Sequence, residues 1–508
     1  MTDPLGAISE QSDGVGHAFE SLSLKDDGVV QQLRSSSGHN FQPAIGKLSS
    51  DVLSEIFSFV CDDCILTSRT STPVVLPHVS RFWRALALGC PTLWSSIHIG
   101  DCPYIVMDGE RAIFLDRVAR AVHMYLARSN SVPIDFECRY LYATAKDLRS
   151  AIGFIVDHSL RWRRISISAD LLQFLDGARG HLPLLESAEV MDADCGDIPS
   201  GFDLFSDSPR LKRWRCDYSL SRIVLPWAQL EDVAFRIDCR PGLAPVNSQL
   251  CRLRKAVVND GNFSDTEHQP DIIRPPTLVE LTVQSMLSPT IGLVPRNPAR
   301  FLDKCTFDHL RSLSIRPDGT VDATKFGNIS WSHVGFMRMV ERSQLGHTLR
   351  RLVLHRVMLS IVELLEVLRA LPCLKCLDVR DPVPASSAEV AACGVPLSTG
   401  RLLEALTDKH AERSEVIVPH LQRLTLHGQM ATNDATVIGL VQSRPSLIDL
   451  VLQFTDSAGF ARPSPLSEVA QAILSEMMNW RRCLGATALG GMPFVAQTVA
   501  KSMGPVSW

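Results

Sequence analysis

The chain has 508 residues, of which 45% are hydrophobic and 21% are charged, and its formal net charge is -4. These values are typical of an ordinary soluble protein of roughly three domains, and the small negative charge argues against a dedicated binder of nucleic acid or another polyanion. The 14 cysteines are scattered, and residues 1–30 lack the basic and apolar regions of a secretory signal. We therefore expect reduced thiols in an intracellular protein, cytoplasmic or nuclear.

The first segment with a clear period begins after residue 46. Residues 1–46 are rich in Ser, Gly and Asp and contain few large apolar side chains, a composition that predicts a disordered tail. In the next segment, LSSDVLSEIFSFV at residues 48–60, the apolar residues recur on one helical face. Ser49 is suited to cap this helix, and Asp51 lies in its first turn, where the helix dipole favours a negative charge.

Two of the 8 tryptophans lie in the segment LPHVSRFWRALALGCPTLWSSIHI, residues 76–99. Val79, Phe82, Trp83 and Leu86 recur at helical spacing and predict a second amphipathic helix, and PTLWSSI predicts a third short helix or turn. A core of three short helices needs bulky side chains to be stable. We expect six residues to fill it: Leu53, Phe57, Trp83, Leu86, Leu93 and Trp94.

A repeating unit follows, in which a leucine, two polar residues, an apolar residue, one further residue and a third apolar residue recur. Its full copies are LVELTV at Leu278, LRSLSI at Leu310, LRRLVL at Leu349, LKCLDV at Leu374, LQRLTL at Leu421 and LIDLVL at Leu447. Weaker copies begin at Trp162, Leu211, Leu230 and Leu253. The alternation within each copy predicts a strand whose second and third apolar residues point inward. Helix-like runs between copies, such as residues 358–372, predict a β-α solenoid of irregular leucine-rich repeats.

We therefore predict an α/β protein in which a small all-α unit precedes the solenoid. Its expected parts are a disordered tail at residues 1–46, the three-helix domain at 47–98, a helical linker at 99–155, the repeats at 156–480 and a C-terminal tail at 481–508. The apolar run at residues 483–500 has the length of a membrane span, but it is rich in Gly and Thr and contains Pro493, so we expect no membrane helix there.

Motifs that would carry chemistry are sparse. The pairs Cys61/Cys64 and Cys373/Cys376 have the CxxC spacing of zinc or redox sites, but the second pair lies within a predicted repeat strand and the two pairs are far apart in sequence. No HExxH, GxSxG or GxxxxGK motif occurs. We predict no catalytic residues, no metal and no cofactor, and an enzyme housed between Asp381 and Glu415 remains the least favoured alternative.

Residues 48–99 resemble the F-box-like domain, in particular the version in the large family of mushroom-type F-box proteins with irregular leucine-rich repeats. The family's three helices carry patterns like LPxEIL, VCxxWRxIA and PxLW. The matching residues here are Leu48, Asp51, Val52, Leu53, Ile56 and Phe57, then Val79, Arg81, Trp83, Arg84, Leu86 and Ala87, then Pro91, Leu93 and Trp94. Ser49 replaces the family's proline and Asp51 its preferred glutamate. LARSNSVPIDFE at residues 126–137 and HSLRWRRISIS at residues 158–168 also resemble that family's link into its repeats.

The resemblance implies a substrate receptor of a cullin-RING (SCF-type) ubiquitin ligase, which does no covalent chemistry itself. The F-box would bind the Skp-family adaptor, and through it the cullin, while the repeats would bind the protein to be ubiquitinated. Matched by motif position, the adaptor-binding candidates are Leu48, Val52, Ile56, Val79 and Arg84. All of these except Arg84 fit the three-helix core equally well. The main alternative is a leucine-rich-repeat interaction scaffold that acts without a ligase.

Basic residues recur in the two polar positions of most repeat copies. Because equivalent positions line up in a stacked array, they could form a basic stripe. The substrate-binding candidates on this stripe are Arg311, Arg350, Arg351, Lys375 and Arg423. One hypothesis is that the stripe attracts an acidic or phosphorylated segment of a substrate protein; the alternative is a solvated edge that keeps the array soluble.

Overall fold

A computed structural model of the protein describes fifteen stretches of the chain and two single residues, 66 and 464. They are residues 48–61, 66, 72–100, 108–138, 148–191, 201–219, 223–237, 249–260, 274–285, 302–317, 328–382, 399–407, 416–428, 433–455, 461–462, 464 and 466–488. The chain divides into two compact units, residues 1–59 and residues 60–508. The predicted tail at residues 1–46 lies outside the described residues.

Helix α2 (Ser50–Val60) ends at the division between the units. Ser49 begins it as predicted: its carbonyl accepts from the Leu53 amide at 3.0 Å and its hydroxyl from the Val52 amide at 3.4 Å. Asp51 lies in the first turn, where a carboxylate offsets the exposed amide dipoles. Leu53 and Phe57, one helical turn apart, are the buried residues of this helix.

The predicted second helix is two helices in the structure, α3 (Thr72–Val79) and α4 (Arg81–Leu88). Ser80 separates them in an extended conformation, and its hydroxyl accepts a 3.1 Å hydrogen bond from the Trp83 amide. A serine in this conformation is a preferred helix cap, so Val79 ends one helix and Trp83 belongs to the next. The predicted short element at PTLW is the 3-10 helix η2 (Pro91–Trp94).

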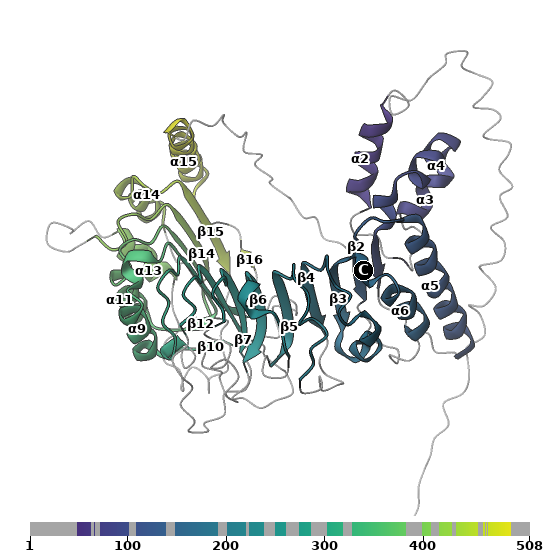
Figure 1. Ribbon diagram of the computed structural model, residues 1–508. Coiled ribbons are helices and arrows are strands. Elements are labelled where there is room, and N and C mark those ends of the chain that lie inside the picture. The colour runs from purple at the N-terminus through teal and green to yellow at the C-terminus, as the bar shows by residue number, and fades with distance from the viewer. Residues whose placement is uncertain are drawn as a thin grey trace, which may run out of the picture. The chain divides into compact units, whose positions relative to one another are not determined.

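Fourteen strands of the described residues form one sheet, in which neighbours in the chain are neighbours in the sheet. Figure 1 shows them side by side in chain order. They are β1 (Ser96–Ile99), β2 (Ile134–Cys138), β3 (Trp162–Ser168), β4 (Ser187–Met191), β5 (Arg213–Ser219), β6 (Asp232–Ile237), β7 (Lys255–Asp260), β8 (Glu280–Ser285), β9 (Ser312–Pro317), β11 (Arg351–His355), β13 (Cys376–Arg380), β14 (Arg423–Gly428), β15 (Asp449–Thr455) and β16 (Ala461–Arg462). All pairs are parallel except β15 with β16.

The connections contain the helices and a second, two-stranded sheet of β10 (Ile329–Ser330) and β12 (Val357–Met358). The helices are α5 (Asp108–Arg128), α6 (Arg149–Val156), η4 (Ser159–Arg161), η5 (Ala169–Phe174), η6 (Asp176–Ala178), η8 (Trp227–Gln229), α9 (His333–Arg342), α10 (Leu345–Thr348), α11 (Ile361–Arg369), α13 (Thr399–Thr407), α14 (Asp434–Ser443) and α15 (Glu468–Ala488). The predicted α/β class is thereby confirmed as a mixed structure with a large parallel sheet. Among the described residues, no helix is both long and apolar enough to cross a membrane.

The repeated sequence coincides with the strands. The first leucine of a copy lies just before its strand and is buried, as at Leu349 and Leu374. The second apolar residues stack in register, with Leu313 beside Leu352, Leu352 beside Leu377 and Leu377 beside Leu424. Each stacked leucine is at most 1% exposed, so burial of this ladder is a main contribution to the stability of the sheet.

The sheet begins earlier in the chain than the predicted repeats. β1 starts at Ser96 and pairs with β2, and both precede residue 156. The segment WSSIHI at Trp94 has the apolar spacing of WRRISI at Trp162. Residues 99–155 therefore contain strands as well as the helices α5 and α6, and α15 extends beyond residue 480 to Ala488.

Candidate interaction surfaces

An apolar stripe is exposed along α2. Val52 is 43% exposed, Ile56 40% and Phe59 85%, and Leu48 just before the helix is 37% exposed. These residues recur at intervals of three and four, so they share the helix face that Leu53 and Phe57 leave open. Three of the adaptor-binding candidates, Leu48, Val52 and Ile56, thus lie on the exposed side of the helix, and the core candidates Leu53 and Phe57 on its buried side.

The second unit exposes further apolar residues on α3 and α4. Val79 is 56% exposed and Phe82 52%. Arg84 is also exposed, but its Nε donates a 2.9 Å hydrogen bond to the Pro77 carbonyl, so part of this adaptor-binding candidate links α4 to the end of α3. Trp83 and Leu86 are half-buried, unlike Leu93 and Trp94, which are buried. The core role that we expected of Trp83 therefore applies more fully to Trp94.

A second candidate surface follows the starts of the strands. Residues at or just before the starts of successive strands are joined by backbone hydrogen bonds, each amide donating to the carbonyl of the residue before it in the row. This row, which we call the edge row, consists of Arg163, Glu186, Lys212, Glu231, Arg254, Val279, Arg311, Arg350, Lys375, Gln422 and Ile448. The predicted alignment of the polar repeat positions is therefore present in the structure.

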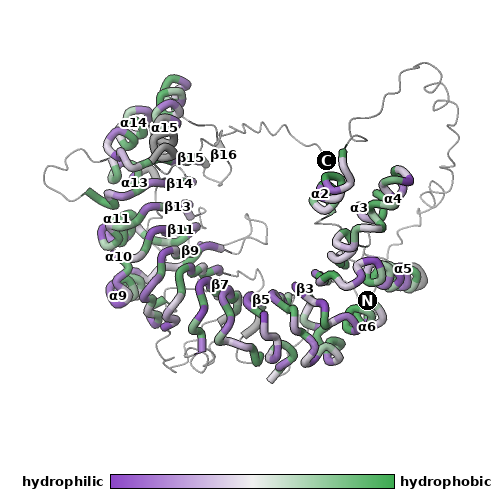
Figure 2. Tube along the Cα trace, turned by 45° about the horizontal axis from the view of Figure 1, so that its top comes forward, coloured by the Kyte–Doolittle hydropathy of each residue, from purple (hydrophilic) through white to green (hydrophobic). Residues whose placement is uncertain are grey.

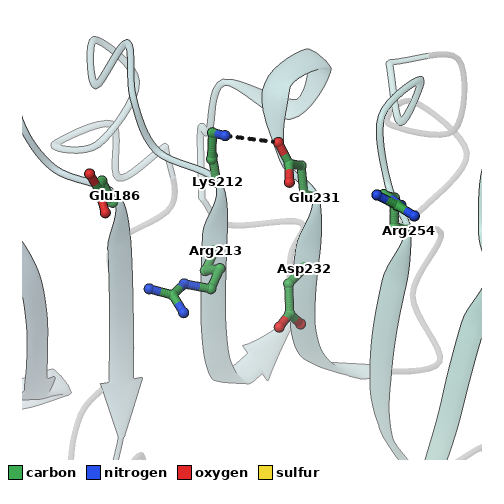
Figure 3. Close-up of a pocket in the computed structure, with 6 residues that line it drawn as sticks. All are labelled: Glu186, Lys212, Arg213, Glu231, Asp232 and Arg254. Carbon is green, nitrogen blue, oxygen red and sulfur yellow. Dashed lines mark ion pairs between the residues drawn. The ribbon is translucent and has the colours of Figure 1, made fainter. Parts of the chain in front are cut away.

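In the first half of the edge row, basic and acidic side chains alternate. The Lys212 Nζ lies 3.2 Å from a Glu231 carboxylate oxygen, and Arg163 binds Asp135 of β2 through two nitrogens. Glu186, Lys212, Arg213, Glu231, Asp232 and Arg254 line a hollow of about 330 Å³. Figure 3 shows Lys212 and Glu231 facing each other across neighbouring strands. The charges of this half largely compensate one another, so the recurring basic residues do not form a purely basic surface here.

The second half of the edge row contains three basic residues and no acidic one. Arg311, Arg350 and Lys375 follow one another, and each amide of the later two donates a 2.8 Å hydrogen bond to the carbonyl before it. Arg351 begins β11 and Arg423 begins β14. Arg423 pairs with Asp449 at 3.0 Å, whereas the structure gives no ion pair to Arg311, Arg351 or Lys375 among the residues it describes. The five substrate-binding candidates thus lie at or just before the starts of β9, β11, β13 and β14.

Sequence reasoning missed a second row of polar residues on the same strands. The residue that follows the third apolar position of a copy is Arg316, His355, Arg380, His427 or Gln453 in five successive copies. His355 pairs in register with Arg380, Arg380 with His427 and His427 with Gln453. A polar residue recurs at this seventh position of the repeat. The two histidines are far apart in the sequence, so the sequence alone does not show that they lie in one row.

The thiols show no arrangement typical of a reactive site. Burial raises the pKa of Cys138 to about 12 and that of Cys305 further, so both remain protonated thiols at neutral pH. Cys373 and Cys376 are half-buried, and Cys64 of the other CxxC pair lies outside the described residues. Within the described part of the chain, no group of three or more His, Cys, Asp or Glu side chains could hold a metal ion. Most of the interval from Asp381 to Glu415 is not described.

Comparisons with known proteins do not assign the chain to a family. No protein-family model matches the chain, and no curated protein matches it either.

Proposed function

We propose that the protein is the substrate receptor of an SCF-type ubiquitin ligase, with an F-box at residues 47–98 and leucine-rich repeats as the substrate-binding part. The observation that carries this proposal is the exposed apolar stripe of α2, Leu48, Val52, Ile56 and Phe59. An apolar stripe of this kind on a helix is typical of a surface that another protein covers.

The resemblance of residues 48–99 to the F-box-like domain suggests which protein binds the stripe. The F-box family uses the corresponding positions to bind the Skp-family adaptor, and Val79 of α3 belongs to the same set. The parallel sheet supports the second half of the proposal, because an array of stacked strands offers a long surface on which a protein segment can lie. The proposed receptor recruits two proteins to each other and needs no catalytic residue.

Copurification with a Skp-family adaptor tests the proposal. The full-length chain is purified with the adaptor and compared with the double variant Val52→Glu/Ile56→Glu, which places two carboxylates on the stripe. Each side chain is about 40% exposed or more, so the variant keeps the buried residues Leu53 and Phe57. Because burying a Val or Ile side chain contributes about 1.5–3 kcal/mol, we expect adaptor affinity to fall by more than about a hundredfold.

The matched control is Val334→Glu/Val362→Glu. These valines are each 61% exposed on α9 and α11, and the control should leave adaptor affinity unchanged. Failure of the unaltered protein to retain the adaptor and cullin would overturn the proposal and favour a repeat scaffold that acts without a ligase. Equal loss of adaptor from both double variants would also contradict it, because the stripe would then have no special part in binding.

A further inference from the structure

The face of the sheet between β9 and β14 carries a row of basic and imidazole side chains beyond the edge row. Arg380 on β13 lies in register between His355 on β11 and His427 on β14. On β9, Ile315 pairs with Leu354, which places the next residue, Arg316, beside His355. The four residues thus occupy one level of four adjacent strands, which are about 4.8 Å apart. We call them the Arg-His row.

Their side chains share one face of the sheet. The residue before each member, Ile315, Leu354, Val379 or Leu426, is at most 1% exposed. Successive side chains of a strand point to opposite faces, so Arg316, His355, Arg380 and His427 point away from the buried leucine ladder. Figure 2 shows hydrophilic stretches along these strands.

The acidic side chains on this face do not balance the basic ones. Asp378 of β13 lies 3.0 Å from the His355 Nε2, and Asp449 of β15 is 3.0 Å from Arg423. Among the described residues, no carboxylate lies within ion-pair distance of Arg316 or Arg380. Between β9 and β14 the face therefore combines the two arginines and two histidines of the row with Asp378, whose carboxylate already contacts a histidine.

The surroundings of both histidines favour the neutral ring. Burial lowers the pKa of His355, and Arg380 and Arg316 lower it further, although Asp378 opposes them. Burial and then Arg380 likewise lower the pKa of His427, and His355 adds to this, while Asp378 and Gln453 oppose it. The backbone amide of Asp381, just after β13, also donates to the His427 carbonyl. A bound anion would offset the repulsion from the arginines and favour the protonated rings.

We propose that the Arg-His row is a binding site for a phosphate monoester on a peptide segment, so that the receptor prefers phosphorylated substrates. This inference rests on the proposed function for its biological meaning. A phosphoryl group offers three acceptor oxygens and close to two negative charges, which suits a row of donors on four neighbouring strands. Arginine forms the fork-shaped contacts that phosphate favours. Lys375 lies just before β13 and Arg351 begins β11. Both could therefore bind acidic residues that flank the phosphorylated one.

Fluorescence anisotropy with the full-length protein tests the site directly. The probe is a labelled peptide of Gly and Ser with one phosphoserine and two flanking Asp residues. It is compared with the unphosphorylated peptide and with one that carries Glu in place of phosphoserine. We expect the phosphopeptide to bind at least about tenfold more tightly than either. Arg380→Gln should lower the affinity for the phosphopeptide at least about tenfold. The control variant Arg369→Gln, at an exposed position of α11, should leave this affinity unchanged.

The pH dependence of phosphopeptide affinity tests whether the histidines take part in binding. From about pH 8 to about pH 7, above the phosphate's second pKa of about 6, affinity should rise as the rings take up protons, and His427→Gln should weaken this rise. Arginines alone would give no rise, so a flat profile in the unaltered protein contradicts the role of the histidines. Circular dichroism of each variant checks that the fold is kept.

Equal binding of the phosphorylated and unphosphorylated peptides would overturn the proposal, as would an unchanged affinity in Arg380→Gln. A single-stranded RNA probe that binds with the same dependence on Arg380, without any preference for phosphoserine, would overturn it in favour of a nucleic-acid site. Because the assay contains no adaptor, its outcome is independent of the copurification test. Phosphopeptide binding without adaptor binding would leave the site standing and reject the ligase role.

Discussion

The indole Nε1 of Trp94 donates a 2.8 Å hydrogen bond to the main-chain carbonyl of Ala87 in the last turn of α4. Helix ends leave their final carbonyls without intrahelical partners, and this bond supplies one. Trp162 repeats the arrangement, since its indole donates to the Ile155 carbonyl near the end of α6 at 3.0 Å. Trp94 lies just before β1 and Trp162 is the first residue of β3, so each tryptophan joins a helix end to the start of a strand, and both are fully buried.

Replacing Trp94 by phenylalanine should destabilise the protein more than the same change at Trp214. Both indoles are fully buried, but Trp214 Nε1 has no hydrogen-bond partner among the described residues. Trp94→Phe loses packing and leaves the Ala87 carbonyl unsatisfied, whereas Trp214→Phe loses packing and removes an unpaired donor. The difference in the free energy of unfolding should be about 1–2 kcal/mol, measured by urea denaturation. Equal losses would show that the hydrogen bond contributes nothing net.

Arg444 is expected to be a strong structural determinant, although arginine is usually a surface residue. It is 5% exposed, and its guanidinium donates to the carbonyls of Leu406, Ile417 and Val418. Burial lowers its pKa. Arg444→Met would leave these carbonyls without their donor and should reduce the free energy of unfolding by about 3 kcal/mol. Thermal denaturation measures the loss, with Arg369→Met on the surface of α11 as the control; similar values for the two variants would contradict the assignment.

Stability should fall as the pH drops below about 6.5. The folded-state pKa values of His355 and His427 are lower than the ordinary value, so the unfolded chain binds protons first and is favoured as the solution becomes acidic. The contribution is fully present above the unfolded pKa and is lost as pH falls toward the folded values. Each histidine adds a slope of at most about 1.4 kcal/mol per pH unit. Denaturation at several pH values should show a shallower slope for His427→Gln.

The lowered pKa of Asp378 should also make the protein less stable as the pH falls, but in a more acidic range than the histidines. Burial alone would raise it, but His355, Arg380 and His427 hold the net pKa below its ordinary value. Its stabilising contribution is therefore present above the unfolded pKa and is lost as pH falls through the folded value. Asp378→Asn should reduce the acid sensitivity of folding in this lower range, and an unchanged unfolding profile would argue against the coupling.

Two ion pairs of similar composition should differ in strength. Arg163 binds Asp135 with two nitrogens, and the Asp135 side chain is 23% exposed, whereas Lys212 and Glu231 are more exposed and make one contact. Bidentate geometry and partial burial strengthen such pairs. Double-mutant cycles to alanine should give a coupling energy of about 1–2 kcal/mol for Arg163 with Asp135 and below about 1 kcal/mol for Lys212 with Glu231. Equal coupling would mean that the second arginine contact adds nothing.

Helix starts and strands could be predicted where they depend only on residues that are close together in the sequence. The cap at Ser49 and the alternation within LRRLVL and LKCLDV each depend on neighbouring residues, because helix starts and strand faces follow from local backbone geometry. The break at Ser80 was missed, because the apolar spacing of Val79 and Phe82 continues across it. The first strand was also missed, since PTLWSSI was interpreted as one short helix or turn, whereas the helix ends at Trp94 and the strand begins at Ser96.

The amino-acid sequence by itself therefore determined which residues form the strands of the repeat and which of their side chains turn inward, since both follow from a period of two. Only the tertiary structure decided which charges meet. Lys212 finds Glu231 while Arg351 has no described ion pair, and His355, Arg380 and His427 lie at one level although 72 residues separate the first from the last. Lateral register between strands depends on the lengths of the connecting segments and on packing of the leucine ladder, which no single repeat specifies.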